Sequence, residues 1–197
     1  MKKIAFFDFD GTITFKDSLF EMIRYSRGAG SFYLGLLVNA PYLVAFKLKL
    51  ISNQRTKERI LKYFFSGTGR AAFQQSCDDF ADEILPGIIR PLALEEISKL
   101  KNNGFEVVVV SASPEHWIKK WADYQGLVLI GTRLQMVDDC VTGLIDGTNN
   151  NGEEKASRIL GSYNLKDYTE IVCYGDTEGD RAMLALGTQT FYRPFRS

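Results

Sequence analysis

The sequence predicts an α/β fold: three layers around a Rossmann-like parallel sheet, with an inserted helical cap domain. From residue 88 onward, apolar strand patterns alternate with helical patterns, which is typical of a parallel sheet covered by helices. The run FEVVVVSAS at residues 105–113 is continuously β-branched at its centre, as in strands that are buried on both faces. Residues 17–84 show only helical spacing and interrupt this alternation.

Length and composition agree with one domain that carries an insertion. The chain has 197 residues, of which 45% are hydrophobic and 24% are charged, as is usual for a globular protein. We therefore expect a core formed by residues 1–14 and 87–197, and a cap formed by residues 15–86. Lys plus Arg and Asp plus Glu are equal at 24 each, so the charge balance does not favour a nucleic-acid partner.

The cysteines and the N-terminus indicate a cytoplasmic protein. The three cysteines, Cys77, Cys140 and Cys173, form no C-x-x-C pair, and their odd number does not suggest a disulfide framework. The apolar stretch near the N-terminus ends at Asp8 and is too short for a signal peptide.

The first strand is predicted at residues 4–9, and helices follow it. Asp17 or Ser18 can cap the first helix. Apolar residues then recur three and four positions apart, which indicates helices that bury one face. They are Leu19, Phe20, Ile23, Ile60, Leu61, Phe64, Phe65, Phe73, Cys77, Phe80 and Ile84.

The remaining elements belong to the core. A helix bearing Leu94 and Ile97 ends at Gly104, and the strand 105–113 follows it. Ser113 is predicted to cap the next helix, with Pro114 at its first position. The later segments are a strand at 127–132, a hairpin at 133–145, a loop at 146–152, a helix at 153–160, a strand at 169–176, a short helix around Met183 and a strand at 188–193.

Two carboxylates follow the first strand, at Asp8 and Asp10. Side chains two residues apart in a strand share a face, and two nearby like charges repel one another when they lose water. An Asp-Gly turn into solvent is one interpretation of this pattern. A cation between the two acids is the other.

Polar residues at further strand ends favour the cation. Ser111 follows a strand, Asp176 ends another, Asp180 comes one helical turn later, and Lys155 begins a helix. The carboxyl ends of parallel strands open on one edge of a sheet, where ligands bind. Oxygen ligands with open positions suit Mg²⁺, and no cluster of His or Cys competes for this role.

These segments resemble the four motifs of the haloacid dehalogenase superfamily. The segments are DFDGT at residues 8–12, VVVVSAS at 107–113, the downstream Lys155, and GDTEGD at 175–180, in order and at plausible spacing. The resemblance implies a Mg²⁺-dependent phosphatase that acts on phosphomonoesters through an aspartyl-phosphate. The acid at Asp10 favours phosphate ester hydrolysis, because dehalogenating members generally lack it.

The resemblance also implies roles for single residues. Asp8 would be the nucleophile, and Asp10 would be the general acid and then the base for water. Mg²⁺ would be held by Asp8, by the backbone carbonyl of Asp10 and by Asp176, with Asp180 supporting the metal or orienting Lys155.

The phosphoryl group would be bound by side chains and backbone together. Ser111 and Lys155 would hold its oxygens, and the backbone N–H groups of Gly11, Thr12 and Ala112 would assist them.

The position of the cap resembles the phosphoserine phosphatase-like branch. Two positions depart from that branch: Asp17 stands where its amino-acid-specific members place Glu, and Gly179 stands where they usually place Asn. The apolar cap segment, together with SASP at residues 111–114, is similar to the phosphatidylglycerophosphatase C type of enzyme. A lipid phosphate is therefore the favoured substrate, and phosphoserine or another small phosphorylated metabolite is the alternative.

Residues 28–46 carry no charge, and Lys47, Lys49, Arg55 and Lys57 follow them. Glycines and Pro41 interrupt this segment, so we do not expect it to span a membrane. It either packs on neighbouring helices or makes peripheral contact with the inner face of the membrane through cap residues 28–57.

Two other functions remain open from the residues alone. A non-catalytic phosphate sensor on this scaffold would be favoured by loss of Asp8, Asp10 or Lys155, which are all present. A phosphotransferase or mutase would pass the phosphoryl group to another hydroxyl instead of water.

Overall fold

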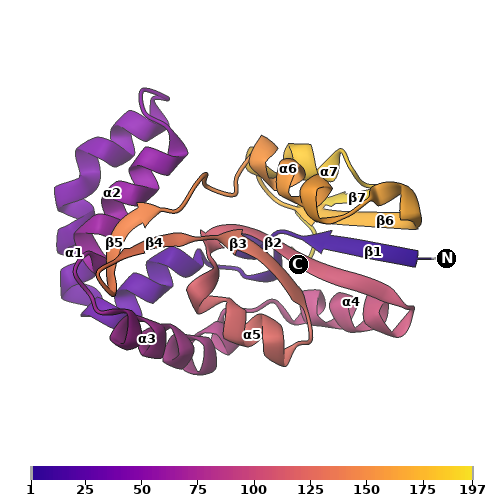
Figure 1. Cartoon of the computed structure of the whole chain (residues 1–197), viewed down its shortest axis with the longest axis horizontal. Helices are drawn as coiled ribbons and strands as arrows, with labels where there is room; N and C mark the ends of the chain where they lie inside the picture. The colour runs from indigo at the N-terminus through magenta and orange to yellow at the C-terminus, as the bar shows by residue number, and fades with distance from the viewer. Residues whose placement is uncertain (1, 197) are drawn as a thin grey trace.

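A computed structural model describes residues 2–196. Its main sheet has five strands in the order β3-β2-β1-β6-β7, and every neighbouring pair is parallel (Figure 1). The predicted α/β class with a parallel sheet is confirmed. The strands are β1 (Lys2–Phe7), β2 (Phe105–Pro114), β3 (Val128–Thr132), β6 (Tyr168–Gly175) and β7 (Gln189–Tyr192).

Helices cover both faces of the sheet, so the core has three layers. Successive residues of a strand point to opposite faces, and β1 buries side chains on both. Ala5 and Phe7 pack in one apolar cluster, whereas Ile4 and Phe6 pack in another. Helices α4 (Pro91–Asn102) and α5 (Lys119–Tyr124) lie on the first face, and α6 (Glu153–Ser162) and α7 (Arg181–Leu184) lie on the second (Figure 1).

The first strand is shorter than the predicted range 4–9. It ends at Phe7, and Phe9–Ile13 forms a tight helical turn that the N–H of Thr14 closes on the carbonyl of Phe9 at 3.0 Å. Gly11 adopts a φ of +84°, which residues with a side chain rarely adopt. Because Asp10 lies in this turn and not in the strand, the side chains of Asp8 and Asp10 do not share one face of the strand as the sequence predicted.

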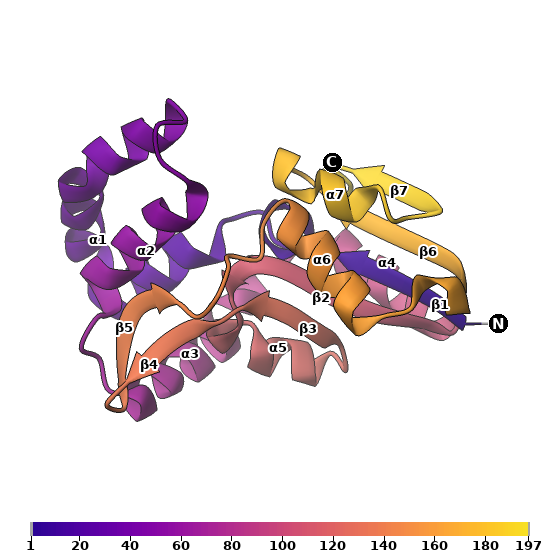
Figure 2. The ribbon, with the colours of Figure 1, turned by 45° about the horizontal axis from the view of Figure 1, so that its top comes forward.

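The cap is helical and lies at one end of the sheet, as both ribbon views show (Figures 1 and 2). Gly28 has a φ of +78° and a non-helical ψ, which divides the longest helix into two parts. The cap helices are α1 (Ser18–Lys47), α2 (Asn53–Phe65) and α3 (Arg70–Glu83).

The predicted hairpin is present as β4 (Leu134–Val137) and β5 (Cys140–Ile145). Its turn residues, Asp138 and Asp139, both have positive φ, as two-residue hairpin turns require. Figure 2 shows the hairpin leaving the core and running beside α2. A Cβ at Gly143 would lie 2.3 Å from the Cα of Lys62, so only glycine permits this close approach.

The predicted helix cap at Ser113 is wrong. Strand β2 continues through Pro114, and a 3-10 turn at Glu115–Trp117 separates it from α5. The hydroxyl of Ser113 donates to a carboxylate oxygen of Asp10 at 2.6 Å, so it is not free to cap the turn. Three further 3-10 turns lie at Leu85–Gly87, Leu165–Asp167 and Glu178–Asp180.

Much of α1 beyond Gly28 faces outward. By length and composition, the helix Ser18–Lys47 is apolar enough to cross a membrane, and 17% of its most apolar window is buried in the chain. The sequence offered packing against neighbouring helices as one of two interpretations of this segment. Such packing buries only a minor part of its residues. Leu37 of α1 is 72% exposed, and Leu50 in the loop after the helix is 73% exposed.

Candidate active site

A cleft of about 220 Å³ lies where the carboxyl ends of the strands meet the cap. Core and cap both contribute to its walls, and most of the lining side chains are polar. The lining residues are Asp8, Asp10, Asp17, Leu19, Asn53, Lys57, Ala112, Ser113, Asn151, Lys155, Thr177 and Asp180.

Lys155 is the buried cation of this cleft, with 1% of its side chain exposed. It comes from the first turn of α6, and its Nζ donates to Asp8 Oδ1 at 2.5 Å and to Asp180 Oδ1 at 2.6 Å. Burial alone would lower the pKa of Lys155, but the carboxylates of Asp8 and Asp180 raise it above its ordinary value. Lys155 therefore remains charged and connects two acids that are far apart in sequence.

Asp8 lies at the end of β1 and is 6% exposed. The hydroxyl of Thr12 donates to its Oδ2 at 3.2 Å. Burial raises the pKa of Asp8 to about 7, because the opposing effect of Lys155 does not fully offset the loss of water. A second positive charge would be needed to hold this carboxylate ionised at lower pH.

Asp8, Asp176 and Asp180 form a cluster of acids that could hold a metal ion. One carboxylate oxygen from each lies within 4.8 Å of the others. Asp176 Oδ1 is buried and has no hydrogen-bond partner among residues 2–196, while its Oδ2 accepts from Arg196 at 2.7 Å. An unpaired buried carboxylate oxygen among all-oxygen donors fits a hard cation such as Mg²⁺.

The carboxylate of Asp10 points elsewhere, although its neighbour Asp8 belongs to the cluster. Asp10 Oδ1 accepts from the backbone N–H of Ser18 at 2.6 Å, and Oδ2 accepts from the hydroxyl of Ser113 at 2.6 Å. Since Ser18 is the first residue of α1, its N–H has no partner within the helix and is available to an anion. Asp10 is thus held at the junction of core and cap.

The structure brings most of the predicted residues together, but four of them do not line the cleft. Asp8, Asp10, Ala112, Lys155 and Asp180 line it, and the other four lie behind its walls. The four are Gly11, Thr12, Ser111 and Asp176.

Each of these four contacts the lining residues or the acidic cluster. The hydroxyl oxygen of Ser111 accepts from the N–H of Ser113 at 3.0 Å and is fully buried. Gly11 approaches Asp176 so closely that a Cβ would lie 2.4 Å from Oδ2. Both residues therefore shape the site from behind, and the Gly11 turn could not carry a side chain.

Ser18, Asn53 and Lys57 make contacts at the site that no pattern in the sequence indicates. Lys57 of α2 donates from Nζ to the carbonyl of Ala112 at 2.9 Å and to Asn149 Oδ1 at 3.1 Å. Burial lowers the pKa of Lys57 to about 8, and nearby carboxylates only partly offset this. No local signal distinguishes these residues, because their contact with the core depends on where the cap docks.

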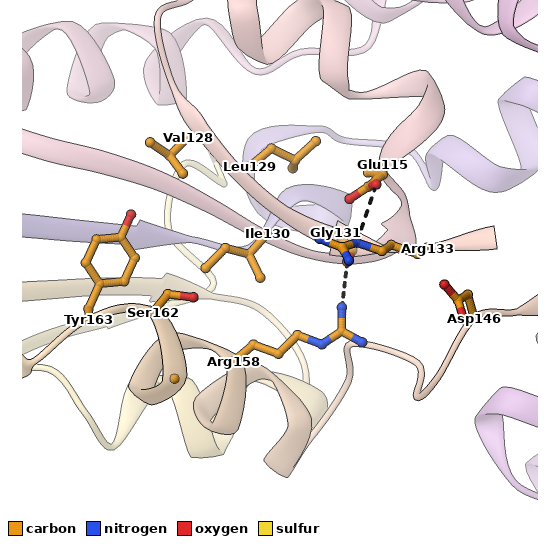
Figure 3. Close-up of a pocket in the computed structure, with 11 residues that line it drawn as sticks. Glu115, Val128, Leu129, Ile130, Gly131, Arg133, Asp146, Arg158, Ser162 and Tyr163 are labelled. Atoms are coloured by element: carbon orange, nitrogen blue, oxygen red, sulfur yellow. Dashed lines mark hydrogen bonds and ion pairs between the residues drawn. The ribbon is translucent and has the colours of Figure 1, made fainter. Parts of the chain in front are cut away.

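A larger pocket of about 550 Å³ lies between β3 and α6, but the arginines that line it already have partners (Figure 3). Arg158 donates to the carbonyl of Gly131 at 2.7 Å, and Arg133 lies 3.8 Å from Glu115 (Figure 3). Because the acidic cluster and Lys155 lie outside this pocket, the smaller cleft is the better candidate for chemistry.

Comparisons with known proteins agree with this geometry. The sequence profile of the haloacid dehalogenase-like hydrolases matches residues 5–185. Protein CicA of Caulobacter vibrioides is 33% identical over 192 residues, which cover 96% of this chain and 85% of that protein.

Solved structures share the fold. A Bordetella pertussis Tohama I protein of unknown function has a TM-score of 0.84 at 21% identity, covering 96% of this chain and 89% of its own. A phosphoserine phosphatase, solved as a phospho-aspartyl intermediate analogue, has a TM-score of 0.70 at 19% identity, covering 96% and 85%.

Removal of the buried cation should destabilise the fold. We expect Lys155→Met to lower the free energy of unfolding by about 3–5 kcal/mol, because two buried carboxylates lose their partner. Urea unfolding in a chelating buffer measures this, with the exposed Lys166→Met as the matched control. Equal stability of the two variants would show that the ion pairs contribute nothing.

The raised pKa of Asp8 predicts a pH-dependent effect on stability. The folded protein keeps the Asp8 proton up to about pH 7, whereas the unfolded chain releases it near 3.8. The stability associated with this proton is full below the unfolded pKa and is lost as pH rises through the folded pKa. In chelating buffer, Asp8→Asn should therefore stabilise the protein more at about pH 8 than at about pH 5.

Urea midpoints at both pH values measure this difference. The exposed Asp123→Asn serves as the matched control and should show no such pH dependence. A wild-type protein that is more stable than Asp8→Asn at both pH values would contradict the expectation.

Proposed function

Because the chain belongs to the haloacid dehalogenase-like hydrolase family, we propose that it is a magnesium-dependent phosphatase. It hydrolyses a phosphomonoester through an aspartyl-phosphate on Asp8. The observation that supports this most directly is Lys155, fully buried between Asp8 and Asp180 beside an acidic cluster. A protein that held this arrangement only for stability would gain little, since buried ion pairs rarely stabilise more than apolar packing.

The proposed reaction has two displacements at phosphorus. A carboxylate oxygen of Asp8 attacks phosphorus, the bond to the substrate oxygen breaks with its electron pair, and Asp10 gives that oxygen a proton. Water then attacks the aspartyl-phosphate while Asp10 takes a proton from it. The bond between phosphorus and Asp8 breaks, which releases inorganic phosphate and restores both acids.

Charge neutralisation is what makes attack by an anion on an anion feasible. Asp8, Asp176, Asp180 and the carbonyl of Asp10 are the groups that would hold Mg²⁺, which when bound withdraws charge from the phosphoryl oxygens. Lys155 supplies a further positive charge next to the attacking carboxylate. A charge-stabilising group of this kind lowers the barrier by about 3–4 kcal/mol.

A lipid phosphate such as phosphatidylglycerophosphate is the substrate class we favour. The cleft of about 220 Å³ accommodates a phosphate and its immediate neighbours, so the remainder of a large substrate would extend past the cap. Phosphoserine or another small metabolite is the second candidate, and the fold shared with phosphoserine phosphatase favours it.

The surface of α1 supports the lipid substrate. We define the apolar face of the cap as nine exposed side chains on α1 and the loop after it. They are Tyr33, Leu34, Leu37, Val38, Tyr42, Val44, Phe46, Leu48 and Leu50. Residues 22–57 contain no acid, and the basic residues within this stretch would complement anionic headgroups.

This face is close to the cleft along the chain. The loop that carries Leu48 and Leu50 leads directly into α2, where Asn53 and Lys57 line the cleft. A bilayer in contact with the loop would thus present lipid headgroups next to the reacting groups. We infer a cytoplasmic protein that is peripheral on the inner membrane face, with residues 15–86 acting as its cap. The free state of all three cysteines fits a reduced compartment.

Phosphate release tests the proposed activity. With Mg²⁺, the wild type should release phosphate from at least one member of a panel of lipid phosphomonoesters, phosphoserine and sugar phosphates. Asp8→Asn should abolish turnover without unfolding, because the nucleophile is lost and a buried charge is removed. Asp123→Asn should keep wild-type activity.

Isotope labelling separates hydrolysis from transfer. Reaction in ¹⁸O water should place label in the released phosphate, because water attacks the phospho-enzyme. Wild-type turnover by Asp8→Asn would refute the nucleophile assignment. Turnover without free phosphate would instead identify a phosphotransferase.

Vesicle flotation tests the apolar face. The protein should float with vesicles of phosphatidylcholine and phosphatidylglycerol more than with phosphatidylcholine alone. The double substitution Lys47→Gln and Lys49→Gln should weaken this partitioning about tenfold or more, at about 1 kcal/mol for each basic residue near the surface. Leu37→Glu should weaken it further, because it buries charge in the apolar layer.

The exposed Lys166→Gln serves as the flotation control. If partitioning depends neither on headgroup charge nor on the two lysines, the proposed contact with anionic membranes is wrong. Self-association of the wild type that Leu37→Glu abolishes would assign the face to a second copy of the chain.

A further inference from the structure

A chain of hydrogen bonds ends on Asp10 and includes two residues outside the four motifs, Ser18 and Trp117. Trp117 Nε1 donates to the hydroxyl of Ser18 at 3.0 Å, and that hydroxyl donates to Ser113 Oγ at 3.2 Å. Ser113 then donates to Asp10 Oδ2 at 2.6 Å. The participants come from the start of the cap, the end of β2 and the turn after it.

The direction of this chain follows from its first member. An indole N–H can only donate, so Ser18 must accept from Trp117 and use its own hydrogen elsewhere. Ser113 Oγ is the acceptor that the structure offers to Ser18. In the reverse direction Ser18 would accept from both neighbours, and its buried hydrogen would have no partner among the described contacts. Trp117 therefore directs the hydrogen of Ser113 toward Asp10.

Both oxygens of Asp10 therefore accept from donors whose direction is fixed. Oδ1 accepts from the backbone N–H of Ser18, and Oδ2 accepts from the hydroxyl of Ser113. Two donors on different elements thus fix the orientation of the carboxyl group at the wall of the cleft, which Asp10 lines.

We propose that Ser113, Ser18 and Trp117 are positioning residues that hold the carboxyl group of Asp10 in the orientation from which it acts on the leaving-group oxygen. This inference rests on the proposed function, in which Asp10 is the general acid. Ser18 and Trp117 do not line the cleft and are fully buried, so they act on the reaction only through Ser113 and Asp10.

Leaving-group dependence separates this role from simple structural support. Phenyl phosphate and p-nitrophenyl phosphate have similar shapes, but phenolate is the more basic leaving group and needs the proton more. The ratio of their kcat/KM values reports the step in which the leaving group departs. Loss of packing alone would slow both substrates by the same factor.

We expect Ser113→Ala to reduce kcat/KM for phenyl phosphate about tenfold more than for p-nitrophenyl phosphate, a part of the full effect of a general acid. Ser18→Ala and Trp117→Phe should change the ratio in the same direction by about threefold, because they act one and two hydrogen bonds further away. Ser26→Ala should leave it unchanged, since this hydroxyl in α1 bonds only to carbonyls of its own helix.

Asp10→Asn, measured in parallel, should give the largest change of ratio. If Asp10→Asn slows both substrates equally, Asp10 is not the acid, and the proposed mechanism fails together with this inference. If Asp10→Asn changes the ratio while Ser113→Ala and Ser18→Ala do not, only the positioning role is overturned. Should Trp117→Phe fail to fold, as near-ultraviolet circular dichroism would show, the two alanine variants still decide the outcome.

Discussion

The site depends on one buried ammonium group held among carboxylates. Lys155 contacts Asp8 from β1 and Asp180 from the turn after β6, so it connects two neighbouring strands of the sheet through charge. Each of these groups loses water on burial. Lys155 and Asp180 favour each other's charged forms, whereas burial still raises the pKa of Asp8 to about 7. The parallel sheet brings them together because the carboxyl ends of β1 and β6 open on the same edge. Asp176 adds a carboxylate whose unpaired oxygen leaves the cluster short of positive charge.

The cap contributes to the chemistry as well as covering it. Its first helix begins at Ser18, whose backbone N–H and hydroxyl both belong to the hydrogen bonds around Asp10. Its second helix contributes Lys57, which bonds to the carbonyl of Ala112 in the core. The hairpin β4–β5 leaves the core and packs against that same helix, where Gly143 permits close contact. Core and cap are therefore connected through Ser18, Lys57 and the hairpin, and Asp10 lies at their junction.

The proposed catalytic residues and the apolar face of the cap lie on different parts of the chain. The acids and Lys155 lie on the core, where rigid strands fix their distances. The apolar face lies on α1 and the loop after it, beyond the Gly28 break, and contributes little to the core. Such a division allows one scaffold to keep its reaction while the cap selects what reaches it. The likeness to phosphoserine phosphatase, at 19% identity, concerns the fold alone. The exposed apolar side chains belong to the cap of this protein.

The sequence alone determined the fold class, the hairpin and the identity of the main charged residues. These features are local: strand periodicity, turn residues and polar groups at strand ends can be read within short windows. The prediction that Ser113 caps a helix was wrong. Its hydroxyl donates instead to the carboxylate of Asp10, a stronger acceptor that is far away in the chain. The roles of Ser18, Lys57 and Trp117, and the exposure of α1, were decided only by the tertiary structure. Each depends on how the cap docks on the core. Contacts between residues that are 55 to 103 positions apart in the chain leave no periodic pattern in the sequence.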